Sequence, residues 1–141
     1  MLIITPTLNF TGNCENALHL YEKAFNSKID FILRYSDADK NDWNISLTEE
    51  QKKYVYHAEM KIGNQRFFFS DTIGFELIKG NSQFLTITFD TKEEVKNAVN
   101  ILMDEGKILI PFRNTTYSSC AGNLIDKYGI RWGLMTEQIE K

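Results

Sequence analysis

The chain has 141 residues and a formal net charge of −3, with 43% hydrophobic and 25% charged residues. This length fits one domain, and the composition is ordinary for a globular protein, which argues against disorder. The sequence has no Lys/Arg cluster of the kind that neutralises phosphates, and no apolar run near the roughly 20 residues that span a bilayer, so we expect no nucleic-acid partner and no membrane partner.

The first half of the chain predicts one strand, one helix and three more strands. Apolar, β-prone residues indicate strands over 3–10, 29–35, 54–62 and 65–70, and Gly63-Asn64 between the last two is typical of a tight hairpin. The residues Ala17, Leu20, Tyr21, Ala24 and Phe25 recur at helical spacing, and Asn13 before them is a suitable N-cap.

The second half predicts the same order of elements. Strands are expected over 84–89, 108–112, 116–124 and 130–135. Thr91 and Glu94 have the spacing of a capping box, in which a hydroxyl and a carboxylate satisfy the first amides of a helix, and Gly106 fits the end of that helix. Asp126 begins a turn before the last strand.

An internal repeat relates the two halves. Residues 7–10 correspond to 86–89 at an offset of 79, and the apolar helix face of 17–25 recurs at an offset of 78 over 95–103. This repeat predicts an α+β fold with two β-α-β-β-β modules, about 1–71 and 82–137, joined by a connector over 72–81 in a single domain, 1–141. The polar segment 36–53, which contains Trp43, is expected to be a long loop with a helical turn near 47–52.

Three stretches carry a resemblance to a known family: Leu8-Asn-Phe-Thr-Gly-Asn-Cys14, His57-Ala-Glu-Met-Lys-Ile-Gly63 with Phe68-Phe-Ser-Asp71, and Asp126-Lys-Tyr-Gly-Ile-Arg-Trp132. With the two modules, they resemble the PhnB-like branch of the vicinal oxygen chelate superfamily, sometimes labelled a 3-demethylubiquinone methyltransferase domain. That superfamily includes glyoxalases, bleomycin- and fosfomycin-resistance proteins and extradiol dioxygenases. The resemblance implies a cleft formed by a curved, eight-stranded mixed sheet, and a homodimer.

In the enzymes of this superfamily, a divalent metal is held in the cleft by His, Glu or Gln on the first and last strands of each module. The corresponding positions lie near Pro6, Phe84 and Gly133 and within 65–70, and none is a His, Asp or Glu. Gln83 could contribute, with His57, to a weak metal site only if the register is shifted by one residue. Because a stable site needs several donors at fixed geometry, we expect no metal ligands.

No organic cofactor is expected either. The methyltransferase label would imply S-adenosylmethionine, whose usual site has a Gly-rich turn between a strand and a helix, and the chain contains no G-x-G. The two cysteines, Cys14 and Cys120, are far apart and are expected to be buried and inert. Together with the absence of a secretory signal pattern, they favour a cytoplasmic location.

His57 and Glu59 are the candidate catalytic residues. In the alternating strand over 54–62, Ala58 and Met60 are predicted to face the helix, and His57 and Glu59 the opposite side. A histidine oriented by a carboxylate can act as a general base. The alternative is a half-exposed polar face with no chemical role.

Five residues are candidates for ligand binding. The consecutive residues Phe67, Phe68 and Phe69 make both faces of their strand apolar, so Phe67, Phe69 and Phe84 are expected to line a cavity, although a packed interior is equally consistent. Arg113 could bind a carboxylate or phosphate and Tyr117 could add a hydrogen bond, although a surface hairpin explains the same cluster. Asp71 is expected to cap the connector or to line the cleft.

These observations leave three functions open. The one we favour is a metal-independent, small-molecule-binding dimer, because the metal positions lack ligands and the strands are rich in aromatic residues. The second is an enzyme of the lyase, isomerase or dioxygenase type that uses His57 and Glu59 in the cleft. The third is a structural or regulatory dimer with a closed interior.

Overall fold

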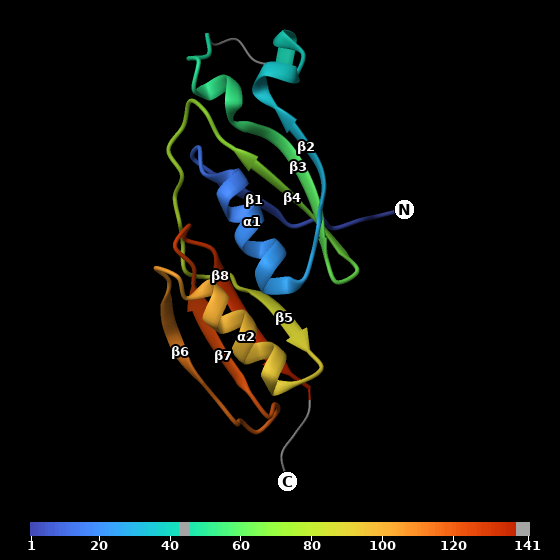
Figure 1. Ribbon diagram of the computed structural model, residues 1–141, viewed down its shortest axis with the longest axis vertical. Helices are drawn as coiled ribbons and strands as arrows, with labels where there is room; N and C mark the ends of the chain where they lie inside the picture. The colour runs from blue at the N-terminus through green and yellow to red at the C-terminus, as the bar shows by residue number, and fades with distance from the viewer. Residues whose placement is uncertain (43–45, 138–141) are drawn as a thin grey trace. The chain divides into compact units, whose positions relative to one another are not determined.

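The computed structural model describes residues 1–42 and 46–137, which fall into two compact units divided between residues 77 and 78. The first unit contains β1 (Thr7–Phe10), α1 (Cys14–Phe25), β2 (Ile29–Arg34), β3 (Val55–Ile62) and β4 (Gln65–Asp71). The second contains β5 (Leu85–Phe89), α2 (Lys92–Leu102), β6 (Lys107–Arg113), β7 (Ala121–Ile125) and β8 (Arg131–Thr136) (Figure 1). The α+β class and the two β-α-β-β-β modules are confirmed.

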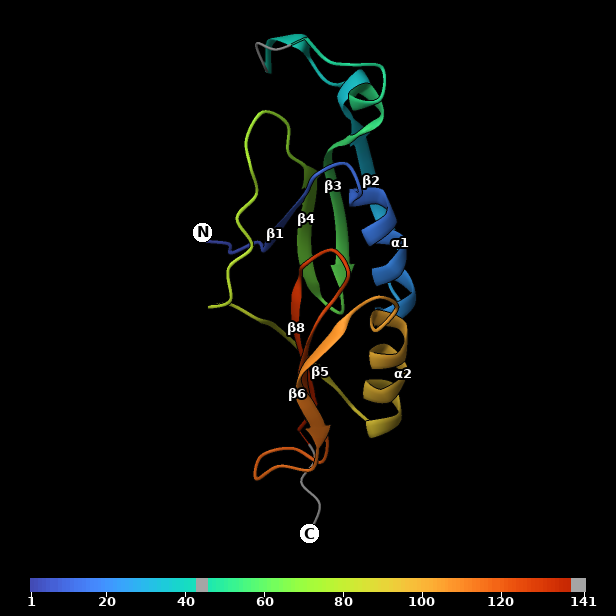
Figure 2. The same ribbon diagram turned by 90° about the vertical axis from the view of Figure 1, so that its left-hand side faces the viewer.

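The two units have the same sheet topology. The strand orders are β1-β4-β3-β2 and β5-β8-β7-β6, with the first pair of each sheet parallel and the other pairs antiparallel. Within each unit, the helix covers one face of its own sheet (Figures 1 and 2). Among the described residues no helix covers the opposite face of either sheet, and every second residue of a strand points toward that face.

The cores lie between each helix and its sheet. In α1 the buried side chains are Cys14, Ala17, Leu18, Tyr21 and Ala24, so Leu18 takes the place that the sequence pattern gave to Leu20. In α2 they are Val95, Ala98 and Leu102. The Gly63-Asn64 hairpin between β3 and β4 forms as expected, with Gly63 at a φ of 60°, where a residue without a β-carbon is favoured.

A buried carboxylate holds the start of α1. Asn13 occupies the N-cap position but its side chain makes no capping bond. Instead, Asp71 at the end of β4 accepts hydrogen bonds from the backbone N–H groups of Gly12 (2.7 Å), Cys14 (3.0 Å) and Val55 (2.9 Å). The expectation that Asp71 caps the connector or lines a cleft was therefore wrong, because its oxygens are used inside the first unit.

The second unit also has a buried carboxylate, which lies in its last turn, between β7 and β8. Asp126 accepts hydrogen bonds from the backbone of Tyr128 and Ile130 and, at 2.9 Å, from the indole Nε1 of the buried Trp132. The predicted turn before the last strand is thus present. At the start of α2, the Glu94 amide donates to Thr91 Oγ1 at 3.2 Å, as the capping spacing predicted.

Two segments differ from the expected strands and loops. β7 begins at Ala121 rather than at 116, because residues 114–120 form a loop whose Ser118 hydroxyl accepts from the backbone N–H groups of Cys120 and Thr136. The described part of the segment between β2 and β3 contains three short 3₁₀ turns, of which Gln51–Lys53 falls near the expected helical turn. Trp43 lies outside the described residues.

Removing the Asp71 carboxylate is expected to destabilise the fold strongly. In Asp71→Ala three backbone N–H groups lose their acceptor, and at about 1–3 kcal/mol for each unsatisfied group the free energy of unfolding should fall by about 3 kcal/mol or more. Urea unfolding followed by circular dichroism measures this change. Asp30→Asn on the exposed side of β2 is the control, and an equal midpoint for Asp71→Ala and Asp30→Asn would contradict the assignment.

Candidate functional site

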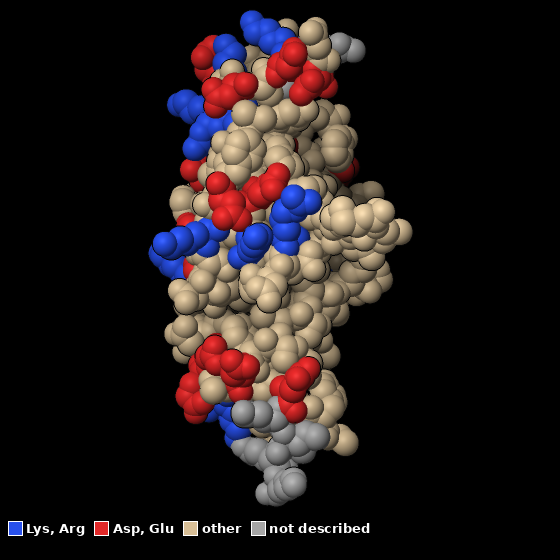
Figure 3. Space-filling view, turned by 90° about the vertical axis from the view of Figure 1, so that its right-hand side faces the viewer, with Lys and Arg blue, Asp and Glu red and all other residues tan. Residues whose placement is uncertain are grey.

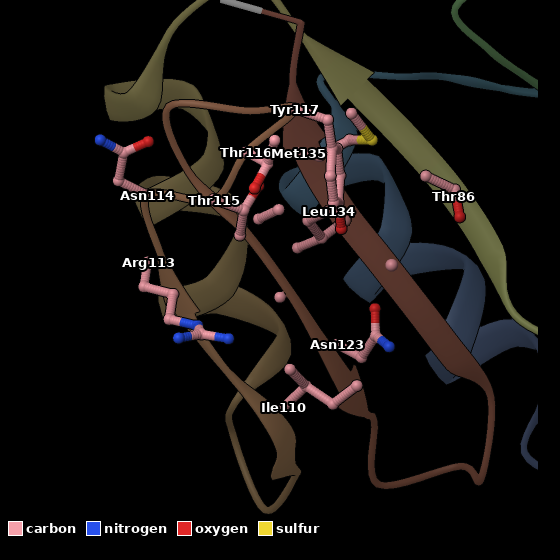
Figure 4. A pocket seen from close by; sticks show the side chains of 13 residues that line it. Thr86, Ile110, Arg113, Asn114, Thr115, Thr116, Tyr117, Asn123, Leu134 and Met135 are labelled. Atoms are coloured by element: carbon pink, nitrogen blue, oxygen red, sulfur yellow. The ribbon is translucent and has the colours of Figure 1, made fainter. Parts of the chain in front are cut away.

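The face of the second sheet that α2 does not cover is hollowed. The hollow has a volume of about 830 Å³ and is lined by residues of β5, β6, β7 and β8 and by the loop after β6 (Figure 4). Small-molecule sites have volumes of roughly 300–1,000 Å³, so this space is large enough for a ligand.

The floor of the hollow is a position without a side chain. Across the sheet, Thr86 in β5 pairs with Gly133 in β8, which pairs with Asn123 in β7. A β-carbon placed on Gly133 would lie only 2.9 Å from Thr86 Oγ1 and 3.1 Å from Asn123 Oδ1. The two polar side chains therefore converge over the backbone of β8.

The first unit has the same row of positions with different side chains. Thr7 in β1 pairs with Phe68 in β4, which pairs with Glu59 in β3. Thr7 and Thr86 are related by the repeat offset of 79, so Phe68 stands where the second unit has Gly133. An aromatic ring thus covers the sheet of the first unit at the position where the second unit has a residue without a side chain.

The polar groups of the hollow are available to a ligand. Among the described residues, Arg113 has no ion-pair partner, and the side chains of Thr86 and Asn123 have no hydrogen-bond partner. Figure 4 shows the guanidinium of Arg113 and the amide of Asn123 extending from their strands into the same space. The walls add apolar surface from Ile110 and Met135.

The predicted catalytic pair is brought together on the open face of the first sheet. His57 Nε2 lies 2.8 Å from Glu59 Oε2, and these side chains are 34% and 28% exposed. The His57 ring meets Phe68 edge-on at a centroid distance of 4.7 Å, and Arg66 Nη1 lies 3.7 Å from Glu59 Oε1. Ala58 and Met60 are buried on the other face, as the alternation predicted.

The structure places the expected ligand-binding residues in three different environments. Arg113 and Tyr117 line the hollow. Phe84 precedes β5, is 38% exposed and is not one of the lining residues. Phe67 and Phe69 are 3% and 0% exposed.

The expectation that Phe67 and Phe69 line a cavity was wrong. Phe69 packs against Tyr21 of α1 at a centroid distance of 6.2 Å and Phe67 stacks beside Phe69, so both belong to the core of the first unit. Phe68, between them in sequence, points to the open face instead. The reason is the strand alternation, in which neighbouring residues point to opposite faces.

Sequence reasoning missed the three residues that form the floor of the hollow, Thr86, Asn123 and Gly133. The available signal was Gly133 itself, because a glycine inside a strand often marks a close approach by a ligand or another chain segment. Because Gly133 lies near a position expected for a metal ligand, we considered only that glycine has no side chain to bind a metal.

The donors present do not fit a metal of the superfamily type. Within residues 1–42 and 46–137, no group of three or more His, Cys, Asp or Glu side chains is placed to hold a metal ion. The lining of the hollow offers hydroxyl, amide and guanidinium groups. Glu59 is already paired with His57 and Arg66, and Gln83 lies before the start of β5.

Neither cysteine has the properties of a nucleophile. Cys14 is 0% and Cys120 5% exposed. Burial, with a smaller contribution from the nearby Asp71 carboxylate, raises the pKa of the Cys14 thiol well above its usual range. At neutral pH Cys14 is therefore a neutral, buried group.

Charge on the surface is mixed in sign. Figure 3 shows one face, on which acidic and basic side chains lie in small alternating groups. No helix among the described residues is both long enough and apolar enough to cross a bilayer.

Comparison with known proteins identifies the family. Residues 3–135 match the model of the family described as 3-demethylubiquinone-9 3-methyltransferase, and the chain belongs to this family. The chain is 23% identical to the protein YjdN of Escherichia coli (strain K12), with 92% of this chain and 91% of YjdN covered.

Two solved structures are similar over nearly their whole length. Protein PA1353 from Pseudomonas aeruginosa has a TM-score of 0.82 and 26% identity, with 98% of this chain and 99% of PA1353 covered. The PhnB protein from Bacillus cereus has a TM-score of 0.77 and 29% identity, with 96% and 99% covered.

A more distant structure shares the fold. The glyoxylase/bleomycin resistance protein/dioxygenase domain from Frankia sp. EAN1pec covers 98% of this chain and is itself 98% covered, with a TM-score of 0.67 and 9% identity. The family match and the PhnB structure confirm the resemblance to the PhnB-like branch, and the Frankia structure shows that its domain has the same fold.

The family's description raises the question of a methyl-donor cofactor. The residues at the two helix starts do not fit a nucleotide-type site, which uses free amides at a glycine-rich helix N-terminus. At α1, the amides of Gly12 and Cys14 donate to Asp71, and at α2 the amide of Glu94 donates to Thr91. We assign no role to S-adenosylmethionine in this chain.

Proposed function

We propose that this protein binds a small molecule in the hollow over Gly133 without using a metal ion. One observation carries the proposal: Thr86, Asn123 and Arg113 present unpaired polar groups to a space of about 830 Å³ that also has apolar walls. A concave apolar surface with a few convergent polar groups is the usual form of a ligand site.

The chemistry of the lining favours binding over turnover. The lining residues include no His, Asp, Glu, Cys or Lys, which are the side chains that most often act as general acids, bases or nucleophiles at neutral pH. Hydroxyl, amide and guanidinium groups recognise a ligand by hydrogen bonds and charge. A sequestering protein needs only these.

We also propose that the protein is a cytoplasmic homodimer. Large apolar side chains are exposed on both sheets, with Phe31 at 48% in the first unit and Ile108 at 41% and Ile110 at 48% in the second, and association would remove such surface from water. Both cysteines are buried and unpaired, as is usual in a reducing compartment.

Sedimentation equilibrium should give twice the chain mass of 16.4 kDa, and a monomer at all concentrations would contradict the dimer.

A second candidate function is catalysis at the His57–Glu59 pair. The observation that favours it is the 2.8 Å contact between His57 Nε2 and Glu59 Oε2, which fixes the imidazole ring. Among the described residues, the other ring nitrogen, Nδ1, has no hydrogen-bond partner. It could take a proton from a substrate held against Phe68.

Filling the floor of the hollow tests the main proposal. In Gly133→Leu the new side chain displaces Thr86 and Asn123 and occupies the space. A metabolite library is screened by ligand-observed NMR against the wild type and this variant, in buffer with EDTA. We expect hits for the wild type whose affinity for the variant falls by about tenfold or more, since the steric conflict costs more than 1.4 kcal/mol.

The matched control is Gly80→Leu, which adds the same side chain at a glycine with open space around it. Hits that bind both variants equally would place the ligand elsewhere and contradict the proposal. Turnover of a hit that is abolished by His57→Gln but kept by Gly133→Leu would favour the second candidate.

A further inference from the structure

The charges around the hollow indicate what its ligand carries. We propose that the ligand is a small molecule with one oxyanion, a carboxylate or a phosphate, joined to a flat apolar body. In this arrangement Arg113 binds the oxyanion, Asn123 and Thr86 bind a polar substituent, and the body packs against the apolar walls at Ile110 and Met135. This inference rests on the proposed function, because it concerns the same site.

The first argument is the unpaired charge of Arg113. The chain has a net charge of −3, with 19 acidic residues against 16 basic ones, so an arginine without an acidic neighbour is notable. Arg113 has no ion-pair partner among the described residues, and none of the residues that line the hollow is acidic. The hollow therefore has a positive local potential, which attracts anions and repels cations.

The second argument is geometry. A guanidinium presents a planar fork of N–H donors that matches the two oxygens of a carboxylate or two oxygens of a phosphate. Figure 4 shows this fork extending into the hollow on the side of β6, with the Asn123 amide across the space from it. An anion at Arg113 thus leaves the rest of the ligand over the floor.

The third argument is the shape of the floor. Because Gly133 has no side chain, the Thr86 hydroxyl and the Asn123 amide converge over β8, with their oxygens about 3 Å from the missing β-carbon position. They form a polar floor against which a flat group can lie. The Thr86 hydroxyl and the Asn123 amide can both donate and accept. Ile110 and Met135 supply apolar contact for the body.

The experiment uses three probes that differ only in the group attached to a benzene ring. Benzoate carries a carboxylate, phenyl phosphate a phosphate, and benzyl alcohol no charge. Each is titrated into the ¹⁵N-labelled full-length protein, and the backbone amide shifts of Asn123 and Gly133 are followed in wild type, Arg113→Gln and Lys107→Gln. Lys107 is the matched control, because it lies exposed on the same strand and its replacement removes the same charge.

We expect at least one of the two anions to shift the Asn123 and Gly133 amides, and we expect benzyl alcohol to bind more weakly. Arg113→Gln should lower the affinity for the anion by about tenfold or more, because a charged hydrogen-bonded pair is lost. Lys107→Gln should change this affinity by less than about twofold. Benzoate binding alone would identify a carboxylate ligand, and phenyl phosphate binding alone a phosphate ligand.

Two results would overturn the inference. If all three probes shift the floor amides equally and Arg113→Gln has no effect, the hollow binds neutral molecules, so the proposed function stands and the anion inference fails. If the anions lose affinity equally in Arg113→Gln and Lys107→Gln, the attraction is non-specific. If no hit from the metabolite library loses affinity in Gly133→Leu, the proposed function itself is contradicted.

Discussion

The register of the second sheet is the constraint on which the site depends. It places Thr86, Gly133 and Asn123 side by side on three neighbouring strands, and a slip of β8 by one residue would turn Gly133 toward α2. The core prevents this slip, because Trp132 and Leu134, on either side of Gly133, are 0% and 1% exposed. Buried core residues thus fix the position of the hollow. Thr86 and Asn123 can converge at its floor because the residue between the two buried anchors has no side chain.

Buried carboxylates hold each unit in that register. Asp71 ties the end of β4 to the start of α1 and to β3, and Asp126 ties the last turn to the indole of Trp132. Both act where a chain reversal leaves backbone amides without partners, so the cost of burying their charge is offset by several hydrogen bonds. The same repeat has diverged on its open faces: the first unit carries Phe68 with His57 and Glu59, and the second carries Gly133 with Asn123. The two units thus share one topology but carry different side chains on the faces that their helices do not cover. The second unit therefore offers the proposed ligand site, and the first an aromatic surface with a polar pair.

The sequence predicted the element order because helical and alternating periodicities are local signals, and the repeat checked one half against the other. It also predicted the orientation of His57 and Glu59, since Ala58 and Met60 mark the buried face. It could not orient the Phe67–Phe69 run, in which both faces are equally apolar, so the choice depends on the pairing of β4 with β1 and β3. It predicted a strand from 116 because Thr and Tyr are common in strands, whereas buried hydroxyl bonds from Ser118 hold a loop there. Asn123 and Thr86 were missed because their convergence over Gly133 is a cross-strand property with no counterpart in linear spacing.

Our central proposal is that this chain binds its ligand in the hollow of the second sheet, through an arginine, an amide and hydroxyls, without a metal ion. The most direct test is the metal content of protein purified without a metal-affinity tag, measured by mass spectrometry before and after incubation with Zn²⁺, Mn²⁺, Ni²⁺ and Fe²⁺ and removal of free ions. We predict well under one ion per chain in every sample. One tightly bound ion per chain would contradict the claim and would make metal-dependent chemistry the leading explanation of the fold's use in this protein.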